Sequence, residues 1–239
     1  KQDFASLREG NYFFVDKTHF ISEWWESGDD ITLIARPRRF GKTLNLSMLQ
    51  YFFEDTGDAE QNVRNRALFT GLNIMNAGEE YISQMGCYPV IFLTLKSAKQ
   101  RNFKAAYFKL KEEISEEFKR HEKQIMSGNI SEDDRTLFYE IASGKADREV
   151  YSGSLKTLSR LLYQVTGRKV IILVDEYDVP LENAYFSGFY NEMIDFTRSL
   201  FESVLKTNAY LQFAVITGCL RISKESIFTG TNNFVSDTI

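Results

Sequence analysis

Residues 31–44 read ITLIARPRRFGKTL, from Ile31 to Leu44. An apolar run with high strand propensity passes directly into Gly-Lys-Thr, and a segment with high helix propensity follows. A strand, a tight turn and a helix in that order are the context of a phosphate-binding P-loop. The backbone N–H groups of such a loop, and those at the start of its helix, converge on an anion. The stretch therefore predicts that the chain binds a nucleoside triphosphate.

Each residue of the turn and of the first helical turn is expected to help bind phosphate. Lys42 would contact the β- and γ-phosphates as a point charge, and the Thr43 hydroxyl would ligate Mg²⁺. The complete set of expected cofactor-binding residues is Arg36, Pro37, Arg38, Arg39, Phe40, Gly41, Lys42, Thr43 and Leu44.

The loop departs from the complete P-loop pattern at Arg36, where the pattern has glycine. An arginine at positive φ would cost about 1–2 kcal/mol, so the loop is expected to open with a different geometry. The loop is also basic, because Arg36, Arg38, Arg39 and Lys42 fall within seven positions. Such cations repel one another unless an anion lies among them. Arg38 and Arg39 therefore either bind polyphosphate or point to solvent and acidic partners.

A second informative stretch, Lys169 to Asp178, reads KVIILVDEYD. Five consecutive aliphatic residues predict a strand buried on both faces, as in a parallel α/β sheet. Ligands bind beyond the C-terminal ends of strands in such sheets. Asp175 is therefore expected to hold Mg²⁺, directly or through water, and Glu176 to orient or deprotonate an attacking water. The alternative is a carboxylate pair that only ends the strand; the P-loop-like stretch favours the functional interpretation.

A third stretch, Tyr210 to Thr217, reads YLQFAVIT and predicts another strand. Thr217 ends it, where its hydroxyl would contact the γ-phosphate or the attacking water. Arg221 follows shortly after, where it would stabilise transition-state charge in cis or in trans. The alternative is an ordinary strand end followed by a surface arginine.

Length and composition limit the class of protein. The 239 residues suit one large domain or two small ones, and the formal net charge of −4 argues against a broad basic footprint for nucleic acid. Apolar runs stay well short of the ~20 residues that cross a bilayer, and the start of the chain does not read as a signal peptide. Cys87 and Cys219 lack metal-ligand spacing and are expected to be buried free thiols in a reducing cytoplasm.

Strands and helices alternate along the chain, which predicts right-handed crossovers and a mostly parallel sheet with helices on both faces. A further strand is expected at 88–95, and the start of the chain is expected to be irregular. Helices are expected at 18–27, 42–54, 61–69, 78–85, 102–126, 131–143, 147–165 and 187–206.

Four segments together resemble the prokaryotic predicted AAA-ATPase-like family, and the resemblance covers essentially the whole chain. The segments are Tyr12–Thr18 (YFFVDKT), Arg36–Thr43 (RPRRFGKT), Val174–Asp178 (VDEYD), and Thr217-Gly218 with Arg221–Lys224 (RISK). The resemblance accounts for the arginine at the glycine position, since this family's loop is typically written that way. It implies a three-layer P-loop NTPase sandwich with strand order 5-1-4-3-2 and one AAA-like ATPase domain over residues 1–239.

Carried onto this chain, the resemblance implies that Lys42 and Thr43 bind phosphate and Mg²⁺, Asp175 the metal and Glu176 the water, with Thr217 as sensor. ATP rather than GTP is implied by the resemblance alone. The Tyr12–Thr18 segment receives no derived role, and contact with the nucleotide base is one hypothesis.

Family members commonly continue into a helical lid and a C-terminal PD-(D/E)xK nuclease-like domain, so the resemblance implies an N-terminal fragment lacking both. Glu117-Phe118-Lys119 fits E-x-K formally, but it lies on an expected amphipathic helix and is not interpreted as a nuclease site. A third function, that of a nucleic-acid-binding or nuclease fragment, is disfavoured by the acidic charge balance, and no nucleic-acid partner is evident in the sequence. Two functions are favoured over it. One is Mg²⁺-dependent ATP hydrolysis that drives a cytoplasmic motor or switch for an attached effector. Oligomerisation is compatible with this function. The other is a nucleotide-dependent interaction or signalling module with negligible hydrolysis.

Overall fold

A single parallel sheet organises the computed structural model, which describes residues 2–206, 208–219 and 234–237. Its strands are β1 (Ile31–Ala35), β2 (Val90–Thr94), β3 (Val170–Asp175), β4 (Leu211–Gly218) and β5 (Phe234–Asp237). The strand order is β2-β3-β4-β1-β5, and every pairing is parallel. Read from the other edge, this is the expected order 5-1-4-3-2.

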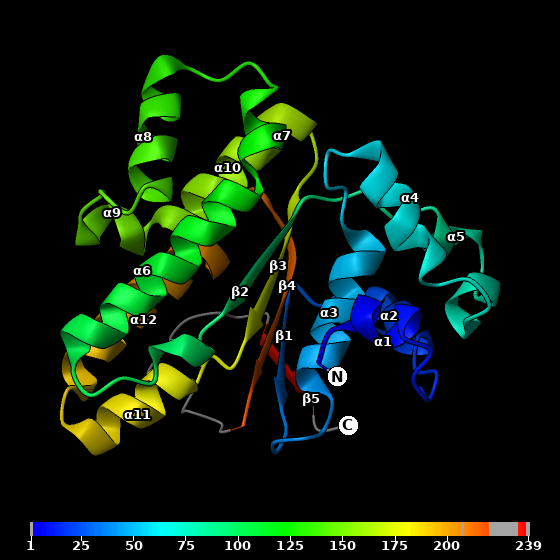
Figure 1. Ribbon diagram of the computed structural model, residues 1–239, viewed down its shortest axis with the longest axis horizontal. Helices are drawn as coiled ribbons and strands as arrows, with labels where there is room; N and C mark the ends of the chain where they lie inside the picture. The colour runs from blue at the N-terminus through cyan, green and yellow to red at the C-terminus, as the bar shows by residue number, and fades with distance from the viewer. Residues whose placement is uncertain (1, 207, 220–233, 238–239) are drawn as a thin grey trace.

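Helices form a layer on each face of the sheet, so the expected three-layer α/β class is confirmed (Figure 1). One layer contains α1 (Phe4–Glu9), α2 (His19–Ser27), α3 (Lys42–Phe53), α4 (Ala59–Ala67) and α5 (Glu79–Ile82). The other contains α6 (Phe103–Arg120), α7 (Glu122–Met126), α8 (Glu132–Ala142), α9 (Arg148–Ser152), α10 (Ser154–Thr166), α11 (Val179–Ser187) and α12 (Tyr190–Leu205). Two short 3₁₀ helices are η1 (Asn73–Asn76) and η2 (Lys96–Ala98).

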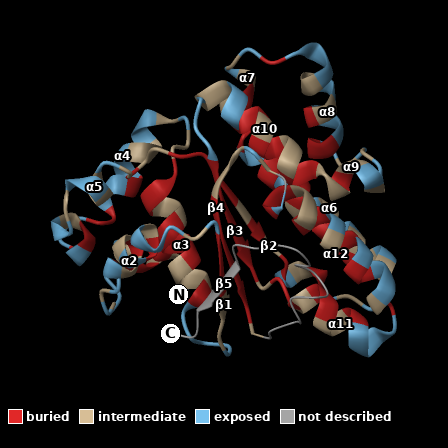
Figure 2. Ribbon diagram, turned by 180° about the vertical axis from the view of Figure 1, so that it is seen from behind, coloured by how far each residue is buried: buried red, intermediate tan, exposed pale blue. Residues whose placement is uncertain are grey.

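The central strand β3 shows why its sequence lacks polar alternation. Ile171 and Leu173 pack into the core on the α3 side, whereas Val170, Ile172 and Val174 pack into the core on the α6 side. All five side chains are buried, as the red strands in Figure 2 illustrate. Burying an aliphatic side chain of this size contributes roughly 1.5–3 kcal/mol, so both faces of β3 stabilise the sheet.

The strand register brings the carboxyl ends of β1, β3 and β4 to one edge of the sheet. Ile34 pairs with Thr217 and Ala35 with Gly218, while Val174 pairs with Ile216 one row below. The P-loop-like turn after β1 and the acidic pair at the end of β3 therefore lie at the same edge, on either side of the end of β4.

Two helices were not expected from the sequence. The start of the chain is helical rather than irregular, because Asp3 accepts a hydrogen bond from the Ser6 N–H (2.7 Å) and caps α1. Helix α11 begins directly after Asp178, with Pro180 in its first turn, a position where proline's missing N–H is tolerated. The helix expected at 187–206 is α12, and Gly188 at φ 81° ends α11 before it.

Two expected long helices are each divided in two. The helix expected at 102–126 is interrupted at His121, whose buried ring lies 3.1 Å from the Val90 carbonyl oxygen. The helix expected at 147–165 is α9 and α10, which meet at Gly153. In the first case a tertiary contact with the sheet overrides a helical sequence pattern.

Glu117, the first residue of the E-x-K tripeptide, stabilises the edge strand β2. Its carboxylate accepts the Phe92 N–H (2.8 Å), and the Arg120 guanidinium donates to both Glu117 and the Val90 carbonyl. Burial alone would raise the pKa of Glu117, but the charge and hydrogen bonds of Arg120 outweigh it and hold that pKa at about 2. The carboxylate therefore covers a strand edge that would otherwise offer free backbone groups.

Both cysteines are free, as expected, although Cys87 and Cys219 are half-buried rather than buried. Among the helices within the described ranges, none combines the length and the apolar character needed to span a membrane.

Candidate nucleotide-binding site

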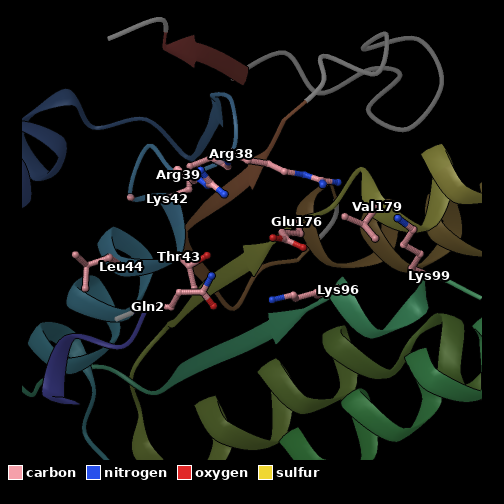
Figure 3. A pocket seen from close by; sticks show the side chains of 11 residues that line it. Gln2, Arg38, Arg39, Lys42, Thr43, Leu44, Lys96, Lys99, Glu176 and Val179 are labelled. Carbon is pink, nitrogen blue, oxygen red and sulfur yellow. The ribbon is translucent and has the colours of Figure 1, made fainter. Parts of the chain in front are cut away.

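A cleft of about 580 Å³ opens at the carboxyl-end edge of the sheet (Figure 3). This volume lies within the usual range for small-molecule sites. Its lining residues are Gln2, Arg38, Arg39, Gly41, Lys42, Thr43, Leu44, Lys96, Lys99, Glu176 and Val179. Seven of the expected site residues therefore meet around one space, together with four that the sequence did not single out.

The backbone of the loop between β1 and α3 shows why arginine can stand at position 36, where the P-loop pattern has glycine. The left-handed residues in this loop are Arg39 (φ 72°) and Gly41 (φ 78°), not Arg36. The Arg36 N–H instead donates to the Gly218 carbonyl (3.0 Å), which extends the β1–β4 pairing by one residue. A glycine is therefore unnecessary at position 36, and the different opening of the loop is confirmed.

The N-terminus of α3 faces the cleft with free backbone donors. Gly41 provides no side-chain cap, and the first turn of α3 contains no acidic residue. The first intrahelical hydrogen bond runs from the Asn45 N–H to the Gly41 carbonyl (2.9 Å). The amides that precede Asn45 have no partner within the helix, and they lie at the positive end of its dipole. This end of α3 can therefore hold an anion.

Lys42 lies beneath the loop. Its ammonium donates to the carbonyls of Arg36 (2.6 Å) and Pro37 (2.9 Å), and its side chain is almost fully buried. The Cys219 sulfur lies 3.5 Å away. The lysine thus connects the start of the loop to the start of α3 and concentrates positive charge at the loop's centre.

Asp175 links the three segments at the centre of the site. One carboxylate oxygen accepts a hydrogen bond from the Thr43 hydroxyl (2.8 Å), and the other accepts one from the Thr217 hydroxyl (2.6 Å). Asp175 and Thr217 are buried. Three residues that lie up to 174 positions apart in the sequence therefore form one chain of hydroxyl, carboxylate and hydroxyl.

The side-chain oxygens of these three hydrogen-bonded residues are suitable ligands for Mg²⁺. A carboxylate and a hydroxyl are oxygen ligands of the kind that a hard divalent cation prefers, with water and phosphate oxygens completing the shell. The part of the chain that the structure describes contains no cluster of three or more His, Cys, Asp or Glu side chains suited to a metal. A cation at Asp175 would therefore depend on the phosphates of a bound nucleotide.

Glu176 projects into the cleft from a strained backbone position. Its φ is 54°, a left-handed conformation that costs a residue with a side chain about 1–2 kcal/mol. The next residue returns to the sheet, since the Tyr177 N–H donates to the Thr217 carbonyl (3.0 Å). Strain of this kind gathers at functional sites. Here it turns one carboxylate out of the strand and toward the loop (Figure 3).

The surroundings of Glu176 favour its protonated form. Burial raises the pKa of its carboxyl, and the negative charge of Asp175 raises it further; the cations Lys96 and Arg38 oppose both effects. A carboxylate with a raised pKa accepts a proton more readily, which suits a general base.

Asp178 fastens the segment that follows Thr217. Its carboxylate accepts the Cys219 N–H (2.9 Å). Gly218 lies directly against the Tyr177 ring, because a Cβ at that glycine would come within 2.5 Å of a ring carbon. The glycine and Asp178 together hold the end of β4 close to the acidic pair.

The remaining expected residues lie outside this arrangement. Pro37 and Phe40 are exposed and Arg36 is half-buried, and none of the three lines the cleft. Arg221 falls outside the described residues. Lys96 and Lys99 were missed, although they follow the expected strand 88–95 and the rule that ligands bind beyond strand C-termini applies to them equally.

Residues of the Tyr12–Thr18 segment form a structural clamp. Asp16 accepts hydrogen bonds from the backbone N–H groups of Thr18 (2.9 Å) and Asn73 (2.7 Å). The buried Thr18 hydroxyl accepts the Ile74 N–H (3.1 Å). Asp16 and Thr18 thus join the start of α2 to η1, and neither lines the cleft.

Comparison with known proteins agrees with this architecture. The sequence model of a family described as "Predicted AAA-ATPase" matches residues 1–228. A protein of Azotobacter chroococcum mcd 1, named "Uncharacterized protein in vnfD 5'region", is 30% identical over 234 residues. That match covers 97% of this chain but 39% of the relative, so the chain spans well under half of the relative's length. No solved structure matches the chain.

Proposed function

The chain belongs to the predicted AAA-ATPase family, and on this premise we propose that its cleft binds ATP with Mg²⁺ and hydrolyses the γ-phosphate bond. The observation that carries the proposal is the hydrogen-bonded chain from Thr43 through Asp175 to Thr217. It couples the phosphate-binding loop to the acidic pair and to the neighbouring strand at a single point.

The loop and α3 are proposed to bind the triphosphate. The free amides at the start of α3 would donate to phosphate oxygens, and Lys42 would supply positive charge at the β- and γ-phosphates. Arg38 and Arg39 line the cleft mouth and would neutralise further charge. Thr43 and Asp175 would hold Mg²⁺, which, when bound, supplies positive charge to the β- and γ-phosphate oxygens.

Glu176 is proposed to act as the general base. In this role its carboxylate accepts a proton from a water that attacks the γ-phosphorus, while the bond to the β-phosphate oxygen breaks and ADP leaves. The Thr217 hydroxyl would position that water or the γ-phosphate. The role expected for Arg221, stabilising charge in the transition state, remains a prediction.

Hydrolysis is proposed to serve as a motor or switch for an attached effector, because the relative extends well beyond the matched region. The competing function is a nucleotide-dependent interaction module without turnover. Release of inorganic phosphate from ATP and Mg²⁺ over many turnovers separates the two. Sustained release supports hydrolysis, and a single burst or no release supports the module.

The same assay is expected to reveal the raised pKa of Glu176. The base must be ionised to accept a proton, so activity should fall as the pH drops through the folded-state pKa. That acid limb should lie above the ordinary glutamate value of 4.5. The measurement is kcat/KM from pH 4.5 to 8. An acid limb at or below the ordinary value would contradict the assigned base.

A further inference from the structure

A second hollow lies over the N-terminal half of α6, separate from the nucleotide cleft. Its volume is about 620 Å³, and its lining includes Lys104, Tyr107, Phe108, Lys109 and Lys111. Two aromatic rings and three lysines line one depression, which therefore offers both apolar and cationic groups to a ligand. Nothing in the proposed ATPase mechanism uses these residues.

The hollow belongs to a strongly basic segment, residues 96–111. This segment contains Lys96, Lys99, Arg101, Lys104, Lys109 and Lys111 and no acidic residue, in a chain whose formal net charge is −4. Within the described part of the chain, Lys96, Lys99, Arg101 and Lys104 make no ion pair, whereas Lys109 pairs with Glu112 at 2.6 Å. Several cations are therefore available to an external polyanion.

Phe108 lies among these cationic side chains. Its side chain is 50% exposed, although an aromatic ring of this size is normally buried. Lys104, Phe108 and Lys111 share one face of α6 because they are four and three residues apart. The ammonium groups of Lys109 and Lys111 lie 5.7 and 5.9 Å from its ring centroid. Tyr107 instead packs against the core, with its ring centroid 5.1 Å from the ring centroid of Phe196.

The basic segment also reaches the nucleotide cleft. Lys96 and Lys99, at either end of η2, line that cleft opposite the loop arginines (Figure 3). The adjoining Gln100 is anchored to α11, since the Asn183 side chain donates to its carbonyl (2.5 Å). A ligand that follows the segment would thus run from the hollow on α6 to the wall of the cleft beside Glu176.

We propose that the basic segment and Phe108 form a binding site for single-stranded nucleic acid. Unpaired lysine and arginine side chains neutralise successive phosphates, and an exposed aromatic ring stacks on a base; this combination is typical of single-strand binding sites. Duplex nucleic acid keeps its bases stacked inside and would leave Phe108 without a partner. An acidic peptide would use the cations but not the ring.

The test measures the fluorescence anisotropy of a labelled oligodeoxyadenylate of about 20 nucleotides, long enough to cover a single-strand site. The whole chain is titrated in excess ADP and Mg²⁺, so that the cleft is occupied. Binding is expected to persist and to weaken steeply as salt increases. Phe108→Ala is expected to lower affinity about fivefold or more. The double variant Arg101→Gln/Lys104→Gln is expected to reduce the salt slope by about 0.7 for each cation removed.

The matched control is Lys169→Gln, an exposed lysine just before β3 at the opposite end of the sheet. It should bind the oligonucleotide like the wild type, and thermal melting should show that all variants fold. Three results would overturn the proposal: no binding at low salt, complete displacement by ADP, or binding unaffected by Phe108→Ala. Equal affinity for polyglutamate would identify an acidic-peptide site instead and would also overturn it.

Discussion

Glu176→Gln is expected to lower kcat for ATP hydrolysis roughly 10²–10⁴-fold, the usual contribution of a general base. Glutamine keeps the size of the side chain and its place in the cleft, but it cannot accept the proton of the attacking water. ATP affinity should change little, because the loop, Lys42 and Asp175 are untouched. The measurement is steady-state phosphate release beside calorimetric ATP binding. Unchanged turnover would refute the role assigned to Glu176.

The same variant should also differ from the wild type in stability, with a sign that follows from the raised pKa of Glu176. A raised folded-state pKa means that the contribution of Glu176 to stability is largest at acid pH and is lost as pH rises through that pKa. Glutamine does not titrate. The difference in melting temperature, variant minus wild type, should therefore increase as the pH rises from acid to neutral. Glu192→Gln, exposed on α12, is the matched control.

Asp175→Asn is expected to abolish the effect of Mg²⁺ on ATP affinity and to lower turnover roughly 10²-fold or more. Asparagine has nearly the same shape and can still hydrogen bond to the hydroxyls of Thr43 and Thr217. The fold should therefore survive, while the negative charge that a divalent cation needs is removed. Calorimetric ATP titrations with Mg²⁺ and with a chelator measure this difference directly. A variant that retains the full Mg²⁺ effect would show that Asp175 does not hold the ion.

Much of the sheet and the centre of the site were predictable from sequence, because both follow from rules about parallel strands. The aliphatic run of β3 requires burial on two faces, and its two cores confirm this. Carboxyl ends of parallel strands share an edge, which places Asp175, Thr217 and the loop at the same edge. The strand order that makes Thr217 the neighbour of both came from the family resemblance, not from these rules. The roles proposed for these residues remain predictions.

Other features depend on tertiary contacts that no local pattern records. The break at His121 comes from a contact with β2, and the clamp formed by Asp16 and Thr18 joins α2 to η1. The left-handed backbone of Glu176 has no signal in its residue type, since glutamate rarely adopts it. Lys96 and Lys99 were hidden for a different reason: lysines after a strand resemble ordinary surface charge until the cleft is seen.

The most direct test of the central claim, that a triphosphate binds where the β1–α3 loop meets the acidic pair, is a calorimetric titration of ATP with Mg²⁺ into wild type and Lys42→Ala. Loss of a charge-assisted hydrogen bond worth about 1.5–3 kcal/mol should weaken ATP binding roughly 10- to 150-fold. Lys169→Ala should bind ATP like the wild type. Equal ATP affinity in the wild type and Lys42→Ala would place the nucleotide elsewhere and contradict the account.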